Sequence, residues 1–447
     1  MAIAQVDQPI LKRLQRGNVE QTLASLSRFM SNSTWLGLQN RYAKETIKTI
    51  ADEIDTGKIL SPAQLSEFIA ASCLLHCGDG WSYLGRAILA LLRGDPHRAR
   101  HLAYYAELRA ATALLATEGI GVFHTEHFAI TAPSKASELG TKKGTHIFAW
   151  DCLEFWSAQT SLANLFAQII RPYGLSLESW YAPLGGALAL APHAQKWFKQ
   201  WGMDLLTFHD DHRVRNISSY QPDGLPRIWS IDGHSVINFV RSLWEALEPS
   251  PACRFDAIDR QILRISLEKY FTARTGKVAA KARTKFESFV KPAIEQQGLS
   301  DEINKQWLEF INRQVNPNDM EIFKYSQKAP DDLAFSAFAV MSRATLLLRA
   351  ASGSTSRLFQ AANHSIDSYK FWWEKFGLAR GLWHGAKDAT ELQDLWIDIR
   401  DSLIEIEAFQ TKHSKDNQTL FRLGEDVSKA VVALGSCERV ALWSMAP

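Results

Sequence analysis

Apolar residues recur through most of the chain at the three- and four-residue spacing of amphipathic helices. The segment 97–118 shows this clearly, because Tyr104, Leu108, Ala111 and Leu115 follow one another at intervals of four, three and four residues. These side chains share one helix face, which we expect to lie in a core. Similar patterns predict helices at residues 18–80, 81–119, 151–216, 236–248 and 254–447.

Short local signals mark the expected ends of one of these helices. Ser61 precedes Pro62, which places a capping side chain before a proline at the first helical position. Gly78 and Gly80 follow after the apolar run. Because glycine is common just beyond a helix, the pattern predicts a helix that begins at Pro62 and ends near these glycines.

The segment 120–150 departs from the helical pattern. The residues 121–130 (GVFHTEHFAI) and 145–150 (THIFAW) are rich in β-branched and aromatic side chains, and a polar stretch at 133–144 separates them. Such side chains favour strands, whereas the intervening Pro, Ser, Lys and Gly favour turns. We therefore expect a short β-hairpin or a long structured loop here.

The composition indicates an all-α protein. Hydrophobic residues make up 46% of the chain and charged residues 22%, which excludes a mainly disordered protein. The 25 Gly and 15 Pro residues are fewer than average for 447 residues, so turn-rich β architecture is disfavoured. We predict helical bundles in three parts: an N-terminal segment at 1–80, a central domain at 81–250 and a C-terminal domain at 254–447.

Charge and cysteine content add little about function. The net charge of +2 is too small to imply a nucleic-acid partner by itself. The five Cys residues are an odd number in mostly apolar surroundings, which predicts buried, reduced thiols. No apolar stretch reaches the ~18 residues of a membrane span, and the N-terminus lacks the apolar core of a signal peptide. These features predict a cytoplasmic protein that does not contact membranes.

Common catalytic and metal motifs are missing from the sequence. There is no P-loop, no GxGxxG, no HExxH, no GxSxG and no CxxC pair, so we predict no cofactor and no metal. Cys73 and Cys77 flank His76 at helical spacing, but no second ligand pair follows, which favours buried thiols over a metal site. His209 and His212 enclose two aspartates, and ion pairs at a helix end are favoured over a metal site there.

Two segments resemble the motifs of HEPN domains. Residues 103–111 (AYYAELRAA), continuing to Ile120 with His124 just beyond, resemble the second-helix signature of that family. Residues 213–220 (RVRNISSY) resemble its closing motif, in which an Arg, often followed by Asn, ends a helix before a polar turn. The resemblance covers roughly residues 81–245.

This resemblance implies a site for RNA. In catalytic HEPN ribonucleases an Arg stabilises charge on the scissile phosphate, and a His a few residues later transfers a proton. Arg215 and Asn216 match the motif, but Tyr220 stands where the His belongs. Because the ordinary pKa of tyrosine is about 10, it is a poor proton acceptor at neutral pH. Either another histidine supplies the proton transfer, with His209, His212 and His124 as candidates, or the domain binds without cutting.

A polar stripe on helix 97–118 adds a further candidate to this set. His101, Tyr105 and Arg109 lie at intervals of four residues, opposite the apolar face. We expect Arg109 or Glu107 to meet the closing motif in one polar pocket between helices. HEPN catalysis usually pairs two domains, so the resemblance also implies a homodimer or a complex with other proteins.

A basic segment at residues 260–291 is the strongest signal for nucleic acid outside the HEPN-like region. It carries nine basic residues against Glu268 and Glu287, a net charge of 9 − 2 = +7. Clustered positive charge near aromatic residues suits an RNA or DNA phosphate backbone. A solvated helix face is the alternative. The residues we expect to contact phosphates are Lys277, Lys281, Arg283 and Lys285.

Two further features have mainly structural interpretations. Arg357 and His364 match the spacing of an Arg–His catalytic pair and would share a helix face, but so loose a pattern arises by chance. Trp372 and Trp373 are better explained as core or interface residues than as a stacking platform. The prediction is a HEPN-like, nucleic-acid-associated component of a prokaryotic defence or toxin-type system. A non-catalytic helical scaffold or regulatory subunit is the alternative.

Overall fold

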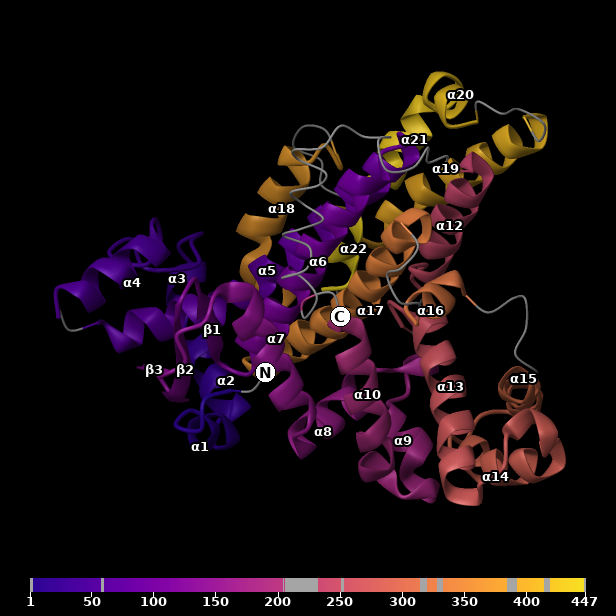
Figure 1. Cartoon of the computed structure of the whole chain (residues 1–447), viewed down its shortest axis with the longest axis horizontal. Coiled ribbons are helices and arrows are strands. Elements are labelled where there is room, and N and C mark those ends of the chain that lie inside the picture. The colour runs from indigo at the N-terminus through magenta and orange to yellow at the C-terminus, as the bar shows by residue number, and fades with distance from the viewer. Residues whose placement is uncertain are drawn as a thin grey trace.

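Three long helices form the centre of the molecule. The computed structural model describes residues 3–57, 60–203, 205, 232–250, 253–313, 320–327, 333–383, 392–413 and 419–445. Among these residues helices dominate and there is one small sheet, so the predicted all-α class is confirmed. The central helices α5 (Pro62–Leu92), α6 (Pro96–Thr117) and α17 (Leu333–Ala361) pack against one another (Figure 1).

Shorter helices surround these three in groups. The N-terminal group consists of α1 (Gln8–Lys12), α2 (Arg16–Ser25), α3 (Ser27–Met30) and α4 (Thr46–Asp55). A second group consists of α7 (Thr145–Ser157), α8 (Thr160–Ile169), α9 (Leu177–Tyr181), α10 (Ala191–Trp201), α13 (Asp256–Thr275), α14 (Arg283–Glu295) and α15 (Asp301–Asn312). A third consists of α12 (Gly233–Ala246), α16 (Glu321–Tyr325), α18 (Lys370–Ala379), α19 (Leu395–Lys412), α20 (Thr419–Asp426), α21 (Ser428–Leu434) and α22 (Glu438–Trp443).

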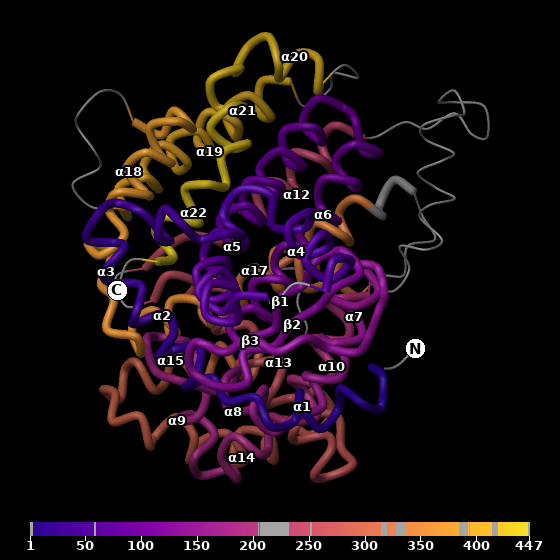
Figure 2. Tube along the Cα trace, turned by 90° about the vertical axis from the view of Figure 1, so that its left-hand side faces the viewer, coloured from indigo at the N-terminus to yellow at the C-terminus, as the bar shows by residue number. Residues whose placement is uncertain are grey.

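The second and third groups lie on opposite sides of the central helices. Figure 2 shows α18, α19, α20 and α21 above α5 and α17, with α9 and α14 below them. Short 3-10 helices connect several of these elements: η1 (Pro172–Gly174), η2 (Ala182–Leu184), η3 (Gly186–Leu190), η4 (Ala279–Lys281), η5 (Ile366–Tyr369) and η6 (Leu392–Asp394). The division of the chain at residues 80 and 250–254 stays a prediction.

Helix α5 begins at Pro62 as predicted, but it does not end at Gly78 and Gly80. It continues to Leu92 and so crosses the expected boundary at residue 80. A Cβ atom on Gly80 would lie 2.6 Å from Cδ2 of Leu348 on α17. Glycine therefore permits close packing of α5 against α17 at this position, and the residue marks a helix contact instead of a helix end.

The segment 120–150 contains a three-stranded antiparallel sheet in the order β1 (Ile120–Phe123), β2 (Glu126–Ala132) and β3 (Lys135–Glu138). β1 and β2 form a hairpin that turns at His124 and Thr125, inside the first expected strand segment and not around the polar stretch 133–144, and β3 adds to β2. Residues 145–150 were expected to favour a strand, but they form the first turns of α7. Phe148 and Trp150 are buried there, so their apolar bulk serves helix packing instead of a strand.

His127 is a buried imidazole at the junction of this sheet with α7. Its ring stacks on Phe148 with centroids 3.5 Å apart, and its Nε2–H donates to the carbonyl oxygen of Lys143 over 2.8 Å. Nδ1 accepts from the backbone N–H of Phe123 over 3.3 Å, which fits the neutral ring. Burial is the main cause that lowers the pKa of His127 to about 4.

The His127→Gln variant tests this buried neutral state. The folded pKa lies below the unfolded value of about 6.5, so between those pH values the unfolded chain binds a proton that the folded protein does not. The stability that neutral His127 contributes is therefore present above pH ~6.5 and is lost as the pH falls toward 4. Urea unfolding at pH 7 and pH 5 should show a smaller stability difference between wild type and variant at pH 5. Parallel pH profiles of the two proteins would contradict the prediction.

Candidate functional site

The predicted catalytic residues fall in two parts of the chain. His212, Arg215, Asn216 and Tyr220 lie outside the described residues, so their clustering with helix α6 stays a prediction. Arg109 is described, and it lies on the face of α6 that is turned toward α5. Its Nη1 donates to Nδ1 of His76 over 2.8 Å, and its Nε lies 3.9 Å from Oδ2 of Asp79.

The polar stripe expected on α6 is matched by a polar stripe on α5. Tyr105 of α6 stacks on Tyr83 of α5, with ring centroids 5.5 Å apart and planes at 26°. His101 contacts the ring of Tyr105 edge-on at 5.0 Å, and the guanidinium of Arg86 lies 5.5 Å from the Tyr83 ring. The two helices therefore meet along their polar residues here, as well as through their apolar faces.

The electrostatics at this contact between α5 and α6 disfavour proton transfer by His76. Burial, together with the charge of Arg109, lowers the pKa of His76 to about 3, so the ring is neutral at physiological pH. Burial raises the pKa of Asp79, while the charges of Arg109, Arg380 and Arg86 oppose that rise. A base with so low a pKa holds almost no proton at neutral pH, so His76 suits hydrogen bonding better than general acid catalysis.

The basic segment does not form the continuous positive face that its net charge suggests. Arg264 is 1% exposed and pairs with Glu268 over 3.0 Å. Arg260 pairs with Asp256 over 2.6 Å, and the ammonium of Lys269 lies 5.3 Å from the Trp197 ring. These cations take part in packing within the protein and are not available to a nucleic acid in the same way as free surface charges.

Lys291 of α14 lies 3.6 Å from Glu295, and the remaining cations gather where α13 ends and α14 begins. We call this set the basic turn, and it consists of Arg274, Lys277, Lys281, Arg283 and Lys285. Gly276 ends α13 in the left-handed conformation, with φ of 66°, which turns the chain toward α14. Phe286 is buried and packs on Phe271 at 5.3 Å, which fixes the turn to α13. All five basic side chains belong to exposed residues.

Like charges lie together in the basic turn. A close contact with Lys285 is the main cause that lowers the pKa of Lys277 below its ordinary value. Among the described residues, Lys277, Lys281 and Lys285 form no ion pair with a carboxylate. Exposed cations without carboxylate partners attract anions, because a bound anion removes their mutual repulsion.

Two further lysines, Lys196 of α10 and Lys269 of α13, lie beside His193 where α10 contacts α13. Burial, followed by the charges of Lys269 and Lys196, lowers the pKa of His193 to about 4. The ring of His193 lies edge-on to Tyr270 of α13 at 6.5 Å, and the Tyr270 hydroxyl donates to the Leu184 carbonyl over 2.8 Å. Of these two lysines, Lys269 belongs to α13, the helix that leads into the basic turn.

Other candidates from the sequence have structural roles. Arg357 and His364 do not share a helix face, because α17 ends at Ala361 and the chain turns before His364. Cys73 and Cys77 are buried free thiols, and burial raises the pKa of both. In the described ranges, no three His, Cys, Asp or Glu side chains are arranged to hold a metal ion.

The comparisons with known proteins give no match. No family model, no curated protein and no solved structure matches the chain. The likeness to HEPN domains therefore depends on the motif residues alone. Within the described part of the chain, no helix combines the length and apolar character needed to cross a bilayer.

Proposed function

We propose that this protein binds nucleic acid through the phosphate backbone and that the basic turn makes the main contacts. The observation that supports this most directly is the cluster of exposed lysines at Lys277, Lys281 and Lys285, which have no carboxylate partner among the residues that the structure describes. Backbone phosphates supply regularly spaced negative charge, and lysine binds them without reading sequence. Arg283 adds a guanidinium at the start of α14, although it also donates to the Asn312 carbonyl over 3.2 Å.

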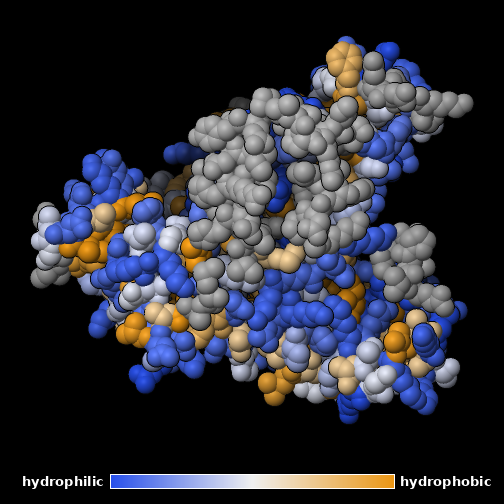
Figure 3. Space-filling model, in the orientation of Figure 1, coloured by the Kyte–Doolittle hydropathy of each residue, from blue (hydrophilic) through white to orange (hydrophobic). Residues whose placement is uncertain are grey.

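The surrounding surface suits a polar ligand. In Figure 3 the lower face of the molecule is mainly hydrophilic, and apolar residues form scattered patches there. Lys196 is exposed on α10, which contacts α13, and it extends the positive charge beyond the basic turn. A strand of nucleic acid that contacts Lys196 and the basic turn would run along α13.

The biological setting that we propose follows the HEPN resemblance. The protein would act as a nucleic-acid-associated component of a prokaryotic defence or toxin-type system, as a homodimer or in a complex, with RNA as the expected ligand. Because Tyr220 replaces the expected His and His76 has a very low pKa, we expect weak or absent nuclease activity from the purified chain.

A scaffold function is the second candidate, and exposed apolar side chains on the C-terminal helices favour it. Ile404 of α19 is 60% exposed, Phe421 of α20 is 65% exposed and Val432 of α21 is 58% exposed. Apolar side chains at such exposure are available to a protein partner. In this case the basic turn would be dispensable for the main interaction.

Charge reversal in the basic turn tests nucleic-acid binding. We expect the triple variant Lys277→Glu, Lys281→Glu, Lys285→Glu to weaken binding of a fluorescent single-stranded RNA by about 10- to 100-fold in anisotropy titrations. The slope of log Kd against log salt should fall by about 2, because three phosphate contacts are lost. A denaturing gel of the same samples measures cleavage.

The matched control reverses three exposed lysines elsewhere: Lys44→Glu, Lys48→Glu, Lys135→Glu. It changes the net charge equally but should keep most of the affinity, and circular dichroism checks that both variants fold. Equal loss in the two triple variants would assign the effect to total charge. If the wild-type protein does not bind the RNA at low salt, or if its affinity does not change with salt, the proposal is wrong and the scaffold function is favoured.

A further inference from the structure

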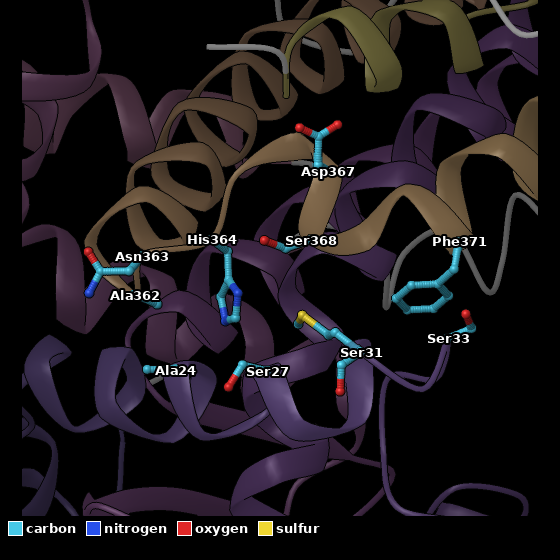
Figure 4. Close-up of a pocket in the computed structure, with 11 residues that line it drawn as sticks. Ala24, Ser27, Ser31, Ser33, Ala362, Asn363, His364, Asp367, Ser368 and Phe371 are labelled. Carbon is cyan, nitrogen blue, oxygen red and sulfur yellow. The ribbon is translucent and has the colours of Figure 1, made fainter.

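Two cavities in the described part of the chain differ in what their walls offer a ligand. The larger, of about 640 Å³, lies between residues 24–33 and residues 362–371. Asp367 is the one carboxylate of its lining, and Figure 4 shows that Asp367 and Asn363 point away from the hollow. The smaller, of about 250 Å³, lies between α1, the end of α6 and α7, and Glu118 belongs to its wall. The smaller cavity is therefore the better candidate for a binding site.

The part of this wall that α1 contributes is held in place by the segment before it. The carboxylate of Asp7 accepts from the backbone N–H of Gly140 over 2.7 Å and from that of Thr141 over 2.8 Å. Leu11 is buried near the end of α1, and Leu14 follows it in the lining. The volume of about 250 Å³ lies just below the ~300–1,000 Å³ of most ligand sites, which suits a small compound.

Glu118 carries the charge that a ligand in this cavity meets. It follows directly after α6, and its side chain is 12% exposed. Its Oε1 accepts from Nη1 of Arg16 over 3.0 Å, whereas its Oε2 accepts no hydrogen bond from the residues that the structure describes. Burial raises the pKa of Glu118, and the charge of Arg16 opposes that rise. A mostly buried carboxylate oxygen in this state is stabilised by a further donor.

The ion pair leaves a net negative charge beside the cavity. Nε of Arg16 lies 3.9 Å from Oε1 of Glu20, so one guanidinium serves two carboxylates. These three groups have a net charge of 1 − 2 = −1. Lys12 belongs to the lining as an exposed residue, so water screens its charge more than that of Glu118. A cation at Oε2 of Glu118 would balance the charge.

Trp156 supplies a hydrogen-bond donor and an aromatic ring to the same cavity. It is buried in α7 and lies edge-on to Phe198 with centroids 5.8 Å apart, which fixes the indole. Its Nε1–H lies near the Glu118 carboxylate, but it has no hydrogen-bond partner among the described residues. A buried N–H in this state favours a ligand that brings an acceptor. The rings of Trp156 and Phe155 also attract cations.

We propose that this cavity binds a small organic ammonium ion that carries a hydroxyl group and an apolar body, as an amino alcohol does. The ammonium would pair with Oε2 of Glu118, and the hydroxyl oxygen would accept from Nε1 of Trp156. The apolar body would pack on Leu11, Leu14 and Phe155. This site is separate from the basic turn and does not depend on the proposed nucleic-acid function.

Calorimetry on the full chain at pH 7, with saturation-transfer NMR for weak binding, tests this site with three probes. L-Phenylalaninol carries the ammonium, the hydroxyl and an aromatic body, whereas 3-phenylpropan-1-ol lacks the ammonium and phenethylamine lacks the hydroxyl. We expect L-phenylalaninol to bind, and 3-phenylpropan-1-ol to bind about tenfold more weakly because it cannot pair with Glu118. Phenethylamine should bind about threefold more weakly, because it leaves Nε1 of Trp156 without an acceptor.

Two variants locate the two polar contacts. Glu118→Gln should weaken L-phenylalaninol about tenfold and leave 3-phenylpropan-1-ol unchanged, so the uncharged probe also shows that the cavity is intact. Trp156→Phe keeps a ring without the N–H, and it should weaken L-phenylalaninol about threefold and leave phenethylamine unchanged. This second variant keeps the pair of Arg16 and Glu118, so it tests the site even if Glu118→Gln does not fold. Glu178→Gln, at an exposed residue of α9 outside the cavity, should bind all three probes like wild type.

The proposal is overturned if L-phenylalaninol does not bind, or if 3-phenylpropan-1-ol binds equally well. It is also overturned if Glu118→Gln and Trp156→Phe both fold and both keep the wild-type affinity for L-phenylalaninol, because the probe then occupies another place. Equal weakening in Glu118→Gln and Glu178→Gln would assign the effect to total charge and would contradict the proposal as well.

Discussion

Replacing Arg349 by methionine is expected to lower the free energy of unfolding by about 3–5 kcal/mol, because it leaves a buried carboxylate without its partner. Arg349 of α17 and Asp259 of α13 are 3% and 0% exposed. They form a two-pronged ion pair, with Nε 2.8 Å from Oδ1 and Nη2 2.6 Å from Oδ2. The same Nη2 also donates to the Ile169 carbonyl over 2.6 Å.

The pair joins the second group of helices to the centre of the fold. Asp259 also accepts from the backbone N–H of Arg171 over 2.6 Å. Burial acts against the charge of Arg349, but the carboxylate of Asp259 outweighs it and holds the pKa of Arg349 above its ordinary value. Arg349 is therefore charged at neutral pH.

Urea denaturation measures the effect of Arg349→Met. The control is Arg357→Met, the same exchange at an exposed position of the same helix, which should change stability by no more than about 0.5 kcal/mol. Adding Asp259→Leu to Arg349→Met should recover part of the loss, because the unpaired charge is removed. Similar losses in Arg349→Met and Arg357→Met would show that the pair does not stabilise the fold as we infer.

The second large effect is expected from Gly85→Ala in α5, with a loss of about 3 kcal/mol. A Cβ atom on Gly85 would lie 2.4 Å from the carbonyl oxygen of Gly435 and 2.8 Å from the backbone N of Cys437. Both opposing atoms belong to the backbone between α21 and α22, so no side-chain rotation relieves the clash. One extra methyl group must therefore separate α5 from the C-terminal helices.

Gly78→Ala in the same helix is the matched control. A Cβ atom on Gly78 meets the Trp372 ring at 3.6 Å, an ordinary contact distance. Alanine is favoured over glycine within a helix by ~0.5–1 kcal/mol, so this variant should be as stable as wild type or slightly more stable. Thermal unfolding of both variants tests this prediction. Equal melting temperatures of Gly85→Ala and Gly78→Ala would contradict the close contact at Gly85.

The sequence was sufficient to predict those features that depend on neighbouring residues. The spacing of apolar side chains identified α6, the Ser61–Pro62 pair located the start of α5, and the β-branched and aromatic residues of 120–150 indicated that a hairpin or structured loop interrupts the helices there. The predicted end of α5 was wrong, because the role of Gly80 depends on its contact with Leu348, which is distant in the sequence. No local pattern distinguishes a glycine that ends a helix from one that admits a neighbouring helix.

The candidate site shows the same limit. Charge counting found the basic segment, but it did not show that Arg264 is buried against Glu268 or that Lys277 lies beside Lys285. Likewise, the sequence singled out His364 only for its spacing from Arg357. Its place beside a cavity results from the turn at Asn363 and from the position of α2, which the spacing does not show. These arrangements depend on tertiary contacts between residues distant in sequence.

The course of α5 across residue 80 also bears on how this protein can be divided or recombined. Trp81, Leu84 and Ile88 are fully buried directly after that position. A fragment ending at residue 80 would cut the helix between its contact with α17 at Gly80 and its contact with the C-terminal helices at Gly85. We therefore expect that the first 80 residues cannot be exchanged as a module, and that a successful exchange has to carry the whole of α5 together with the helices packed on it.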